Sequence, residues 1–217
     1  YDLYKYLRDN TTGFTELAAF PSTQLLFGVR RASNPEGAQS YPGEFVSGNY
    51  FAMFGLRPHA GRLLTPADDD PGAPAVAVMS YRLWQQRYGA DPSIIGSIFD
   101  VNDKPFAVVG ITPPGFFGET LRSAPPDFFL PLTTEPLVQT DTDLGKYDTH
   151  WLELIGRLKP GVSGGQALAA VNVINARIYA DHEKNKKPVP MKLQPVGQVP
   201  EVHGAMVLLM STLTVLA

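Results

Sequence analysis

Glycine and proline interrupt this chain so often that it can form only short helices and strands joined by tight turns. The sequence holds 20 residues of each type among its 217, which is about one and a half times their usual share. Both residue types favour turns and tend to end helices and strands. We therefore expect a mixed fold of many short elements, and a bundle of long helices is excluded.

The rest of the composition is that of a folded domain. Apolar residues make up 44% of the chain and charged residues only 18%, which is too apolar for a disordered chain. This is enough apolar material for one substantial core or two small ones. Cysteine is absent, so disulfides and thiolate metal sites are excluded. The net charge of −3 argues against charge-driven binding to nucleic acid.

Local patterns predict an element in most parts of the chain. Ser80 is a helix cap and Gly89 ends the same helix, and residues 102–105 connect two apolar runs as a hairpin. The expected helices cover residues 2–9, 49–54, 81–88 and 163–181. The expected strands cover residues 17–30 with a break at Pro21, 41–47, 76–79, 98–101, 106–111, 128–132, 151–158 and 191–196.

One motif suggests nucleophilic catalysis. Residues 161–165 match G-x-S-x-G, the pattern around the nucleophile of α/β-hydrolases, with Ser163 at its centre. Candidate partners follow along the chain: Asp181, His182, Glu183, Glu201 and His203. However, Asp181 and His182 are adjacent, and no glycine-rich loop precedes the motif to form an oxyanion hole. Because Ser163 and Gln166 together form a capping box, we favour a helix cap, with a serine hydrolase as the alternative.

Metal and nucleotide sites have little support. Asp68, Asp69 and Asp70 could hold a divalent cation, but they lack the glycine and the distant glutamate of a calcium-binding loop. An acidic loop or a helix cap is the favoured interpretation. The histidines are scattered, without a metal-binding pair: His59, His150, His182 and His203. Neither a Walker A motif nor G-x-G-x-x-G is present. We expect no catalytic, cofactor or metal-binding residues.

Aromatic residues gather in the middle of the chain. The group comprises Trp84, Tyr88, Phe116, Phe117, Phe128 and Phe129. It could line a groove for an apolar ligand in a free-standing binding module, or it could be the core of a small subdomain. We favour the core.

The end of the chain is apolar. Residues 204–217 form a run of 14 residues without a charge, whereas a membrane-spanning helix needs about 20. The run is either a buried terminal element or the start of a transmembrane helix.

The segment Val46 to Gly118 resembles the MacB-like periplasmic core domain of bacterial ABC-transporter permeases of the MacB/FtsX-like superfamily. The resemblance is strongest to the large duplicated permeases of acidobacteria. A second matching block is Ile155 to Val162. The motifs that carry the resemblance are Ser47-Gly48-Asn49-Tyr50-Phe51, Gly61-Arg62, Ser80 to Trp84, Asp91-Pro92, Ile95-Gly96 and Val109-Gly110-Ile111. Together these linked motifs make the resemblance specific.

The resemblance implies an α+β fold, with a split βαβ porter-like layer and an inserted, smaller mixed α/β subdomain. We assign residues 1–60 and 146–200 to the porter-like part and residues 61–145 to the insert. Residues 204–217 fall where the second transmembrane helix should begin.

The resemblance also implies a non-catalytic role on the periplasmic side of the inner membrane. The domain would couple ATP-driven motion to substrate handling or partner docking. The implied partners are a cytoplasmic ATP-binding subunit or domain, the transmembrane helices of the permease, a periplasmic adaptor protein and a second copy in a homodimer. Nucleic acid is not among them, and no cofactor is implied.

Overall fold

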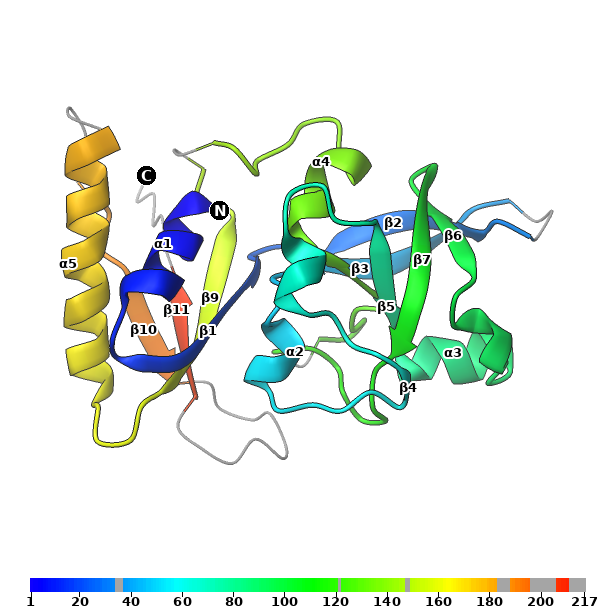
Figure 1. Ribbon diagram of the computed structural model, residues 1–217, viewed down its shortest axis with the longest axis horizontal. Coiled ribbons are helices and arrows are strands. Elements are labelled where there is room, and N and C mark those ends of the chain that lie inside the picture. The colour runs from blue at the N-terminus through cyan, green and yellow to red at the C-terminus, as the bar shows by residue number, and fades with distance from the viewer. Residues whose placement is uncertain (34–36, 121, 147–148, 183–187, 196–205, 211–217) are drawn as a thin grey trace. The chain divides into compact units, whose positions relative to one another are not determined.

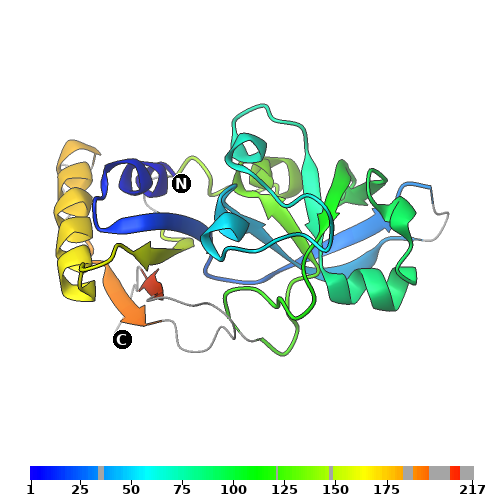
Figure 2. The same ribbon diagram turned by 60° about the horizontal axis from the view of Figure 1, so that its bottom comes forward.

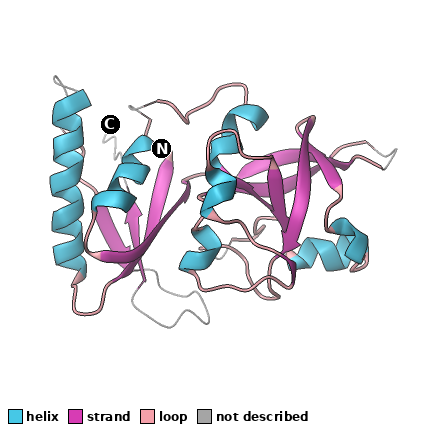
Figure 3. Ribbon diagram, viewed as in Figure 1, coloured by secondary structure: helices cyan, strands magenta, loops and turns pink. Residues whose placement is uncertain are grey.

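The computed structural model describes the 217-residue chain except residues 34–36, 121, 147–148, 183–187, 196–205 and 211–217. The chain divides into two compact units (Figures 1, 2 and 3). The first, here called the sheet unit, comprises Tyr1–Ser22 and Gly145–Ala217. The second, here called the barrel unit, comprises Thr23–Leu144. Both units mix helices and strands, which confirms the expected α+β class.

The sheet unit is built on a four-stranded sheet with the strand order β1-β9-β11-β10, in which every pairing is antiparallel. Its elements are α1 (Asp2–Asn10), β1 (Phe14–Pro21), β9 (Leu152–Leu158), α5 (Gly164–His182), β10 (Lys192–Pro195) and β11 (Met206–Met210). Strands β9 and β10 are therefore parallel, joined by α5, with β11 between them. This is the split βαβ arrangement that the resemblance implies.

Two helices pack in the sheet unit. Helix α1 contacts β1 and α5, and α5 also contacts β10. Tyr4 and Leu7 lie one turn apart on the buried face of α1, and the Tyr4 hydroxyl donates a hydrogen bond to the carbonyl of Leu17 on β1 at 3.3 Å. Ala167 and Val171, four residues and again about one turn apart, are fully buried on α5. These apolar faces hold the helices in place.

The barrel unit is built on a seven-stranded sheet with the order β4-β7-β5-β8-β3-β2-β6, and β6 also pairs with β7. Six of these strands therefore form a closed ring, and β4 lies beside β7 outside it. Closure leaves the ring without exposed edges. The elements are β2 (Leu25–Arg31), β3 (Gln39–Val46), α2 (Tyr50–Met53), β4 (Ala60–Gly61), η1 (Pro66–Asp69), β5 (Val76–Met79), α3 (Tyr81–Tyr88), η2 (Pro92–Ile94), β6 (Ile98–Val101), β7 (Lys104–Ile111), β8 (Phe128–Pro131), η3 (Leu132–Thr134) and α4 (Glu135–Val138).

Phenylalanine rings fill the interior of the barrel. Phe27 and Phe45 make an edge-to-face contact with centroids 5.4 Å apart, and Phe99 lies 5.9 Å from Phe128. All four are fully buried. Gly43 is required next to Phe27, because a Cβ atom at this position would lie 2.1 Å from the ring.

Most of the locally predicted elements are confirmed. Strand β5 and helix α3 have the predicted bounds, with Ser80 Oγ accepting from the Leu83 amide at 3.0 Å and Gly89 at a φ of 57°. The hairpin between β6 and β7 is also present, with a tighter turn than expected. Asn102 and Asp103 both have positive φ, as a two-residue turn requires.

The expected boundary at residue 60 differs from the observed division. Residues 23–60 lie in the barrel unit, because β2 pairs with β6 and β3 pairs with β8. The segment expected as one interrupted strand, 17–30, is two strands in different sheets. The inserted unit is consequently the larger of the two rather than the smaller.

The apolar tail also differs from expectation in its described part. Residues 206–210 form strand β11 between β9 and β10 rather than a helix, and this pairing satisfies their backbone polar groups. Residues 204–205 and 211–217 lie outside the described residues. Within the described part of the chain, no helix has both the length and the apolar character to cross a membrane.

Candidate functional site

Ser163 lies just before helix α5 and forms the predicted capping box. Its amide donates to Gln166 Oε1 at 2.9 Å, and its Oγ accepts from the Gln166 amide at 3.3 Å. Asp181 and His182 are at the other end of the same helix, about 27 Å away at 1.5 Å per residue. The local partners proposed for a nucleophilic serine are therefore out of reach. Glu183, Glu201 and His203 lie outside the described residues.

Two of the three consecutive aspartates are engaged in hydrogen bonds that fix the polypeptide backbone. Asp68 accepts from both terminal nitrogens of Arg62 at 2.7 Å and from the Thr65 amide at 2.8 Å. Asp69 accepts from the amides of Gly48 at 3.3 Å and Thr133 at 2.8 Å. Burial raises the pKa of Asp68, but the hydrogen bonds from Arg62 and Thr65 outweigh it and lower the pKa below its usual value. The structure therefore gives these aspartates an architectural role.

The described residues contain no cluster of three or more His, Cys, Asp or Glu placed to hold a metal ion. The two described histidine side chains lie in different units. The His59 ring contacts Tyr81 and Trp84 with centroids 4.7 and 5.1 Å apart. His150 Nε2 lies 2.7 Å from the Tyr179 hydroxyl on α5.

The aromatic residues of the middle region are divided between the two faces of the barrel wall. Phe128 lies in the interior, whereas Phe129 packs outside it against Phe51 and Phe116, with centroids 5.3 and 5.8 Å apart. Trp84 is buried, and Tyr88 contacts Phe99 edge-to-face at 5.6 Å. Of the group, Phe117 is an exposed large hydrophobic residue. Most of these rings thus serve as core.

Sequence reasoning missed a buried ionic cluster on the outer face of the barrel. This cluster, called here the Tyr50 cluster, comprises Glu44, Tyr50, Glu119 and Arg122. Glu44 is on β3, Tyr50 is on α2, and the other two are on the loop between β7 and β8. The Tyr50 hydroxyl donates to Glu119 Oε2 at 2.7 Å. Arg122 makes ion pairs with Glu119 at 2.6 Å and with Glu44 at 3.4 Å.

Burial dominates the electrostatics of the Tyr50 cluster. Glu44, Tyr50 and Glu119 are all less than one-twentieth exposed. Burial, together with the neighbouring carboxylates of Glu119 and Glu44, raises the pKa of Tyr50 well above its ordinary value. Tyr50 therefore stays a neutral hydrogen-bond donor. The cluster attaches the loop to the barrel wall. Its sequence signal is Glu44, a charged residue directly before the apolar pair Phe45 and Val46 at the buried end of β3.

Comparison with known families gives one match over most of the chain. The family described as "MacB-like periplasmic core domain" matches residues 2–174. Macrolide export ATP-binding/permease protein MacB of Campylobacter jejuni is 28% identical over 167 residues, which are 73% of this chain and 25% of that protein. The chain thus spans about a quarter of the length of this relative.

Solved structures with the same fold belong to proteins of this kind. The periplasmic region of MacB from Actinobacillus actinomycetemcomitans superposes with a TM-score of 0.55 at 17% identity, covering 86% of this chain and 75% of that one. The extracellular domain of the noncanonic ABC-type transporter YknZ from Gram-positive bacteria gives a TM-score of 0.54 at 15% identity, covering 86% and 84%. At these identities the similarity establishes the fold.

Proposed function

Because this chain belongs to the family of MacB-like periplasmic core domains, we propose that it is the extracytoplasmic domain of an ABC-transporter permease. In this role it carries nucleotide-driven movements of the membrane helices to a transported substrate or a docked partner protein. The domain performs no chemistry itself, and the engagement of Ser163 in a helix cap supports this part of the proposal.

The observation that carries the proposal is how the sheet unit is assembled from distant parts of the chain. Strand β1 lies near the beginning of the chain. It pairs with β9 along its length, with Phe14 opposite Leu158 at one end and Pro21 opposite Leu152 at the other. Strand β9 in turn pairs with β11. The hydrogen bonds of one sheet thus join the first and last described segments, so a displacement of either segment acts on the whole unit.

The proposed assembly follows from the family. Transmembrane helices of the permease adjoin the domain, a cytoplasmic ATP-binding subunit or domain supplies the energy, and two permease copies work as a pair. The domain faces the periplasm from the inner membrane, where an adaptor protein could dock. A free-standing ligand-binding module would share the fold but lack the membrane helices and the ATPase.

Labelling of single cysteines in the full-length permease tests the extracytoplasmic position. The chain has no cysteine of its own, so Gln85→Cys on α3 and Ala176→Cys on α5 provide one exposed thiol in each unit. The fully buried Ala18→Cys is the matched control. We expect a membrane-impermeant maleimide to label both exposed thiols in intact spheroplasts and the control only after denaturation. Labelling of the exposed thiols only after the inner membrane is permeabilised would contradict the proposal.

A further inference from the structure

One surface of the barrel unit combines exposed aromatic and cationic side chains from three segments. The segments are residues 55–59 after α2, residues 113–118 after β7, and Tyr81 at the start of α3. None of these segments contains aspartate or glutamate, although the chain as a whole carries a net charge of −3. The surface that they form is called here the aromatic face.

The first two segments lie side by side and run antiparallel. At one end the ring centroids of Phe54 and Phe116 are 5.5 Å apart. At the other end the His59 amide donates to the carbonyl of Ile111 at 2.9 Å. Arg57 lies between these two contacts and is exposed. Because it belongs to no ion pair among the described residues, it gives the aromatic face a positive charge that this part of the chain does not neutralise.

Phe117 is 40% exposed, yet the loop that carries it is held in place. The preceding ring, Phe116, packs against Phe51 and Phe129 with centroids 5.9 and 5.8 Å apart. Further along the same loop, the Tyr50 cluster attaches the chain to the barrel wall through a hydrogen bond and ion pairs. A ring presented on a fixed loop loses little conformational freedom when a partner binds it.

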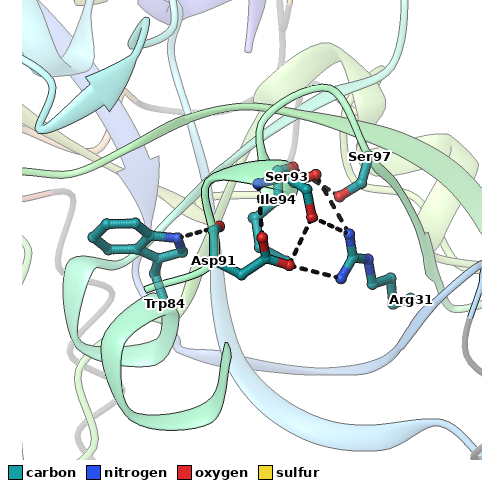
Figure 4. A network of polar contacts seen from close by, with 6 residues as sticks. All are labelled: Arg31, Trp84, Asp91, Ser93, Ile94 and Ser97. Carbon is teal, nitrogen blue, oxygen red and sulfur yellow. Dashed lines mark hydrogen bonds and ion pairs between the residues drawn. The ribbon is translucent and has the colours of Figure 1, made fainter. Parts of the chain in front are cut away.

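The part of the aromatic face at α3 is fixed by the polar network in Figure 4. The Trp84 ring contacts the rings of His59 and Tyr81, with centroids 5.1 and 5.7 Å apart. Its Nε1 donates to the carbonyl of Asp91 at 2.8 Å (Figure 4). The side chain of Asp91 in turn makes an ion pair with Arg31 at 3.3 Å (Figure 4). The exposed His59 and the partly exposed Tyr81 are thus supported by a fixed indole.

We propose that the aromatic face docks a partner protein of the permease. Phe117 enters an apolar pocket of the partner, and carboxylates at the edge of that pocket pair with Arg57. Aromatic residues and arginine contribute most at protein interfaces, and the lack of acidic residues in the three segments favours an acidic partner. A fixed loop favours a protein pocket over a lipid surface, because preorganisation gains most where the binding site has a defined shape. This proposal rests on the transport role above, in which a partner protein docks on the domain.

Photo-crosslinking in the full-length permease tests the aromatic face. Benzoylphenylalanine replaces Phe117 in living cells, and the adducts formed under ultraviolet light are identified by mass spectrometry. The matched control carries the same amino acid in place of Leu137 on α4, which is 50% exposed. We expect an adduct with another protein at position 117 that is absent at position 137. Adducts with lipid or a second permease copy alone, the same adducts at both positions, or no adduct would overturn the proposal.

The affinity of the captured protein for the full-length permease then tests the proposed chemistry. Phe117→Ala should weaken the affinity at least about tenfold, as expected for the loss of a buried aromatic anchor. Arg57→Glu should weaken it at low salt, with an effect that shrinks as the salt concentration rises. Leu137→Ala should leave it unchanged. An affinity that neither Phe117→Ala nor Arg57→Glu reduces would overturn the proposal.

Cysteine labelling separates a failure of this proposal from a failure of the proposed function. If Gln85→Cys and Ala176→Cys are labelled in intact spheroplasts but position 117 captures no protein, the domain is extracytoplasmic and the aromatic face is not its docking surface. If those two thiols are inaccessible until the inner membrane is permeabilised, both proposals are wrong.

Discussion

The hydroxyl of Tyr50 lies 2.7 Å from Oε2 of Glu119 and donates a hydrogen bond to it in a buried site. This bond joins α2 to the loop between β7 and β8. Arg122 of the same loop bridges Glu119 and Glu44, so one guanidinium pairs with two buried carboxylates. The attachment of the loop to the barrel is therefore ionic as well as apolar.

Removal of the Arg122 guanidinium should destabilise the fold strongly. Arg122→Met leaves two buried carboxylates without this positive charge, so we expect the free energy of unfolding to fall by about 3 kcal/mol. Urea denaturation followed by fluorescence measures the change. Arg122→Lys, which keeps the charge, should recover part of the loss. Equal stability of the methionine and lysine variants would show that charge is not what holds this loop.

Ser163 should contribute to stability and not to catalysis. Ser163→Ala removes the side-chain oxygen of the cap, so the free energy of unfolding should fall by about 1 kcal/mol. Ser163→Asp retains a capping oxygen, so its free energy of unfolding should stay close to that of the native chain. Thermal and urea unfolding compare the three proteins. An ester hydrolysis activity of the native chain that disappears in both variants would contradict this interpretation.

Asp68 should make the free energy of unfolding depend on pH under acidic conditions. Its pKa is lower in the folded chain than the usual value of 3.8, so its charged form stabilises the fold above that value. The contribution is lost as the pH falls through the lowered pKa. We expect Asp68→Asn to lower the free energy of unfolding by about 2 kcal/mol at neutral pH. The difference from the native chain should shrink towards roughly pH 3.

Urea unfolding curves across this pH range provide the measurement, and Asp70→Asn is the control. Asp70 is exposed, so its substitution should change stability by less than about 0.5 kcal/mol at any pH. A deficit of Asp68→Asn that stays constant down to the lowest pH would rule out the ionic explanation.

The sequence predicts those parts of the fold that depend on neighbouring residues. Ser80 and Gly89 mark both ends of α3, because a capping side chain and a left-handed residue act within one turn. The pairing of strands is different, since it depends on contacts between distant residues. Nothing local indicates that residues 17–30 divide between two sheets, or that β6 pairs with β2 in addition to its predicted hairpin partner β7.

The same distinction holds for the candidate sites. The cap at Ser163 is predictable because Gln166 is three residues away. The Tyr50 cluster is not, since Glu44 and Arg122 come from separate segments that only the folded barrel brings together.

The central claim is that this domain moves with the nucleotide state of a transporter. The distance between the two copies of the domain in the permease pair tests this movement most directly. A spin label on Ala176→Cys is placed in the full-length permease, assembled with its ATPase in lipid nanodiscs, with other cysteines replaced. Pulsed electron resonance then gives the distance distribution between the labels. We predict that it shifts when nucleotide is trapped and does not shift with an ATPase variant that cannot bind nucleotide. Identical distributions with and without trapped nucleotide would contradict the account.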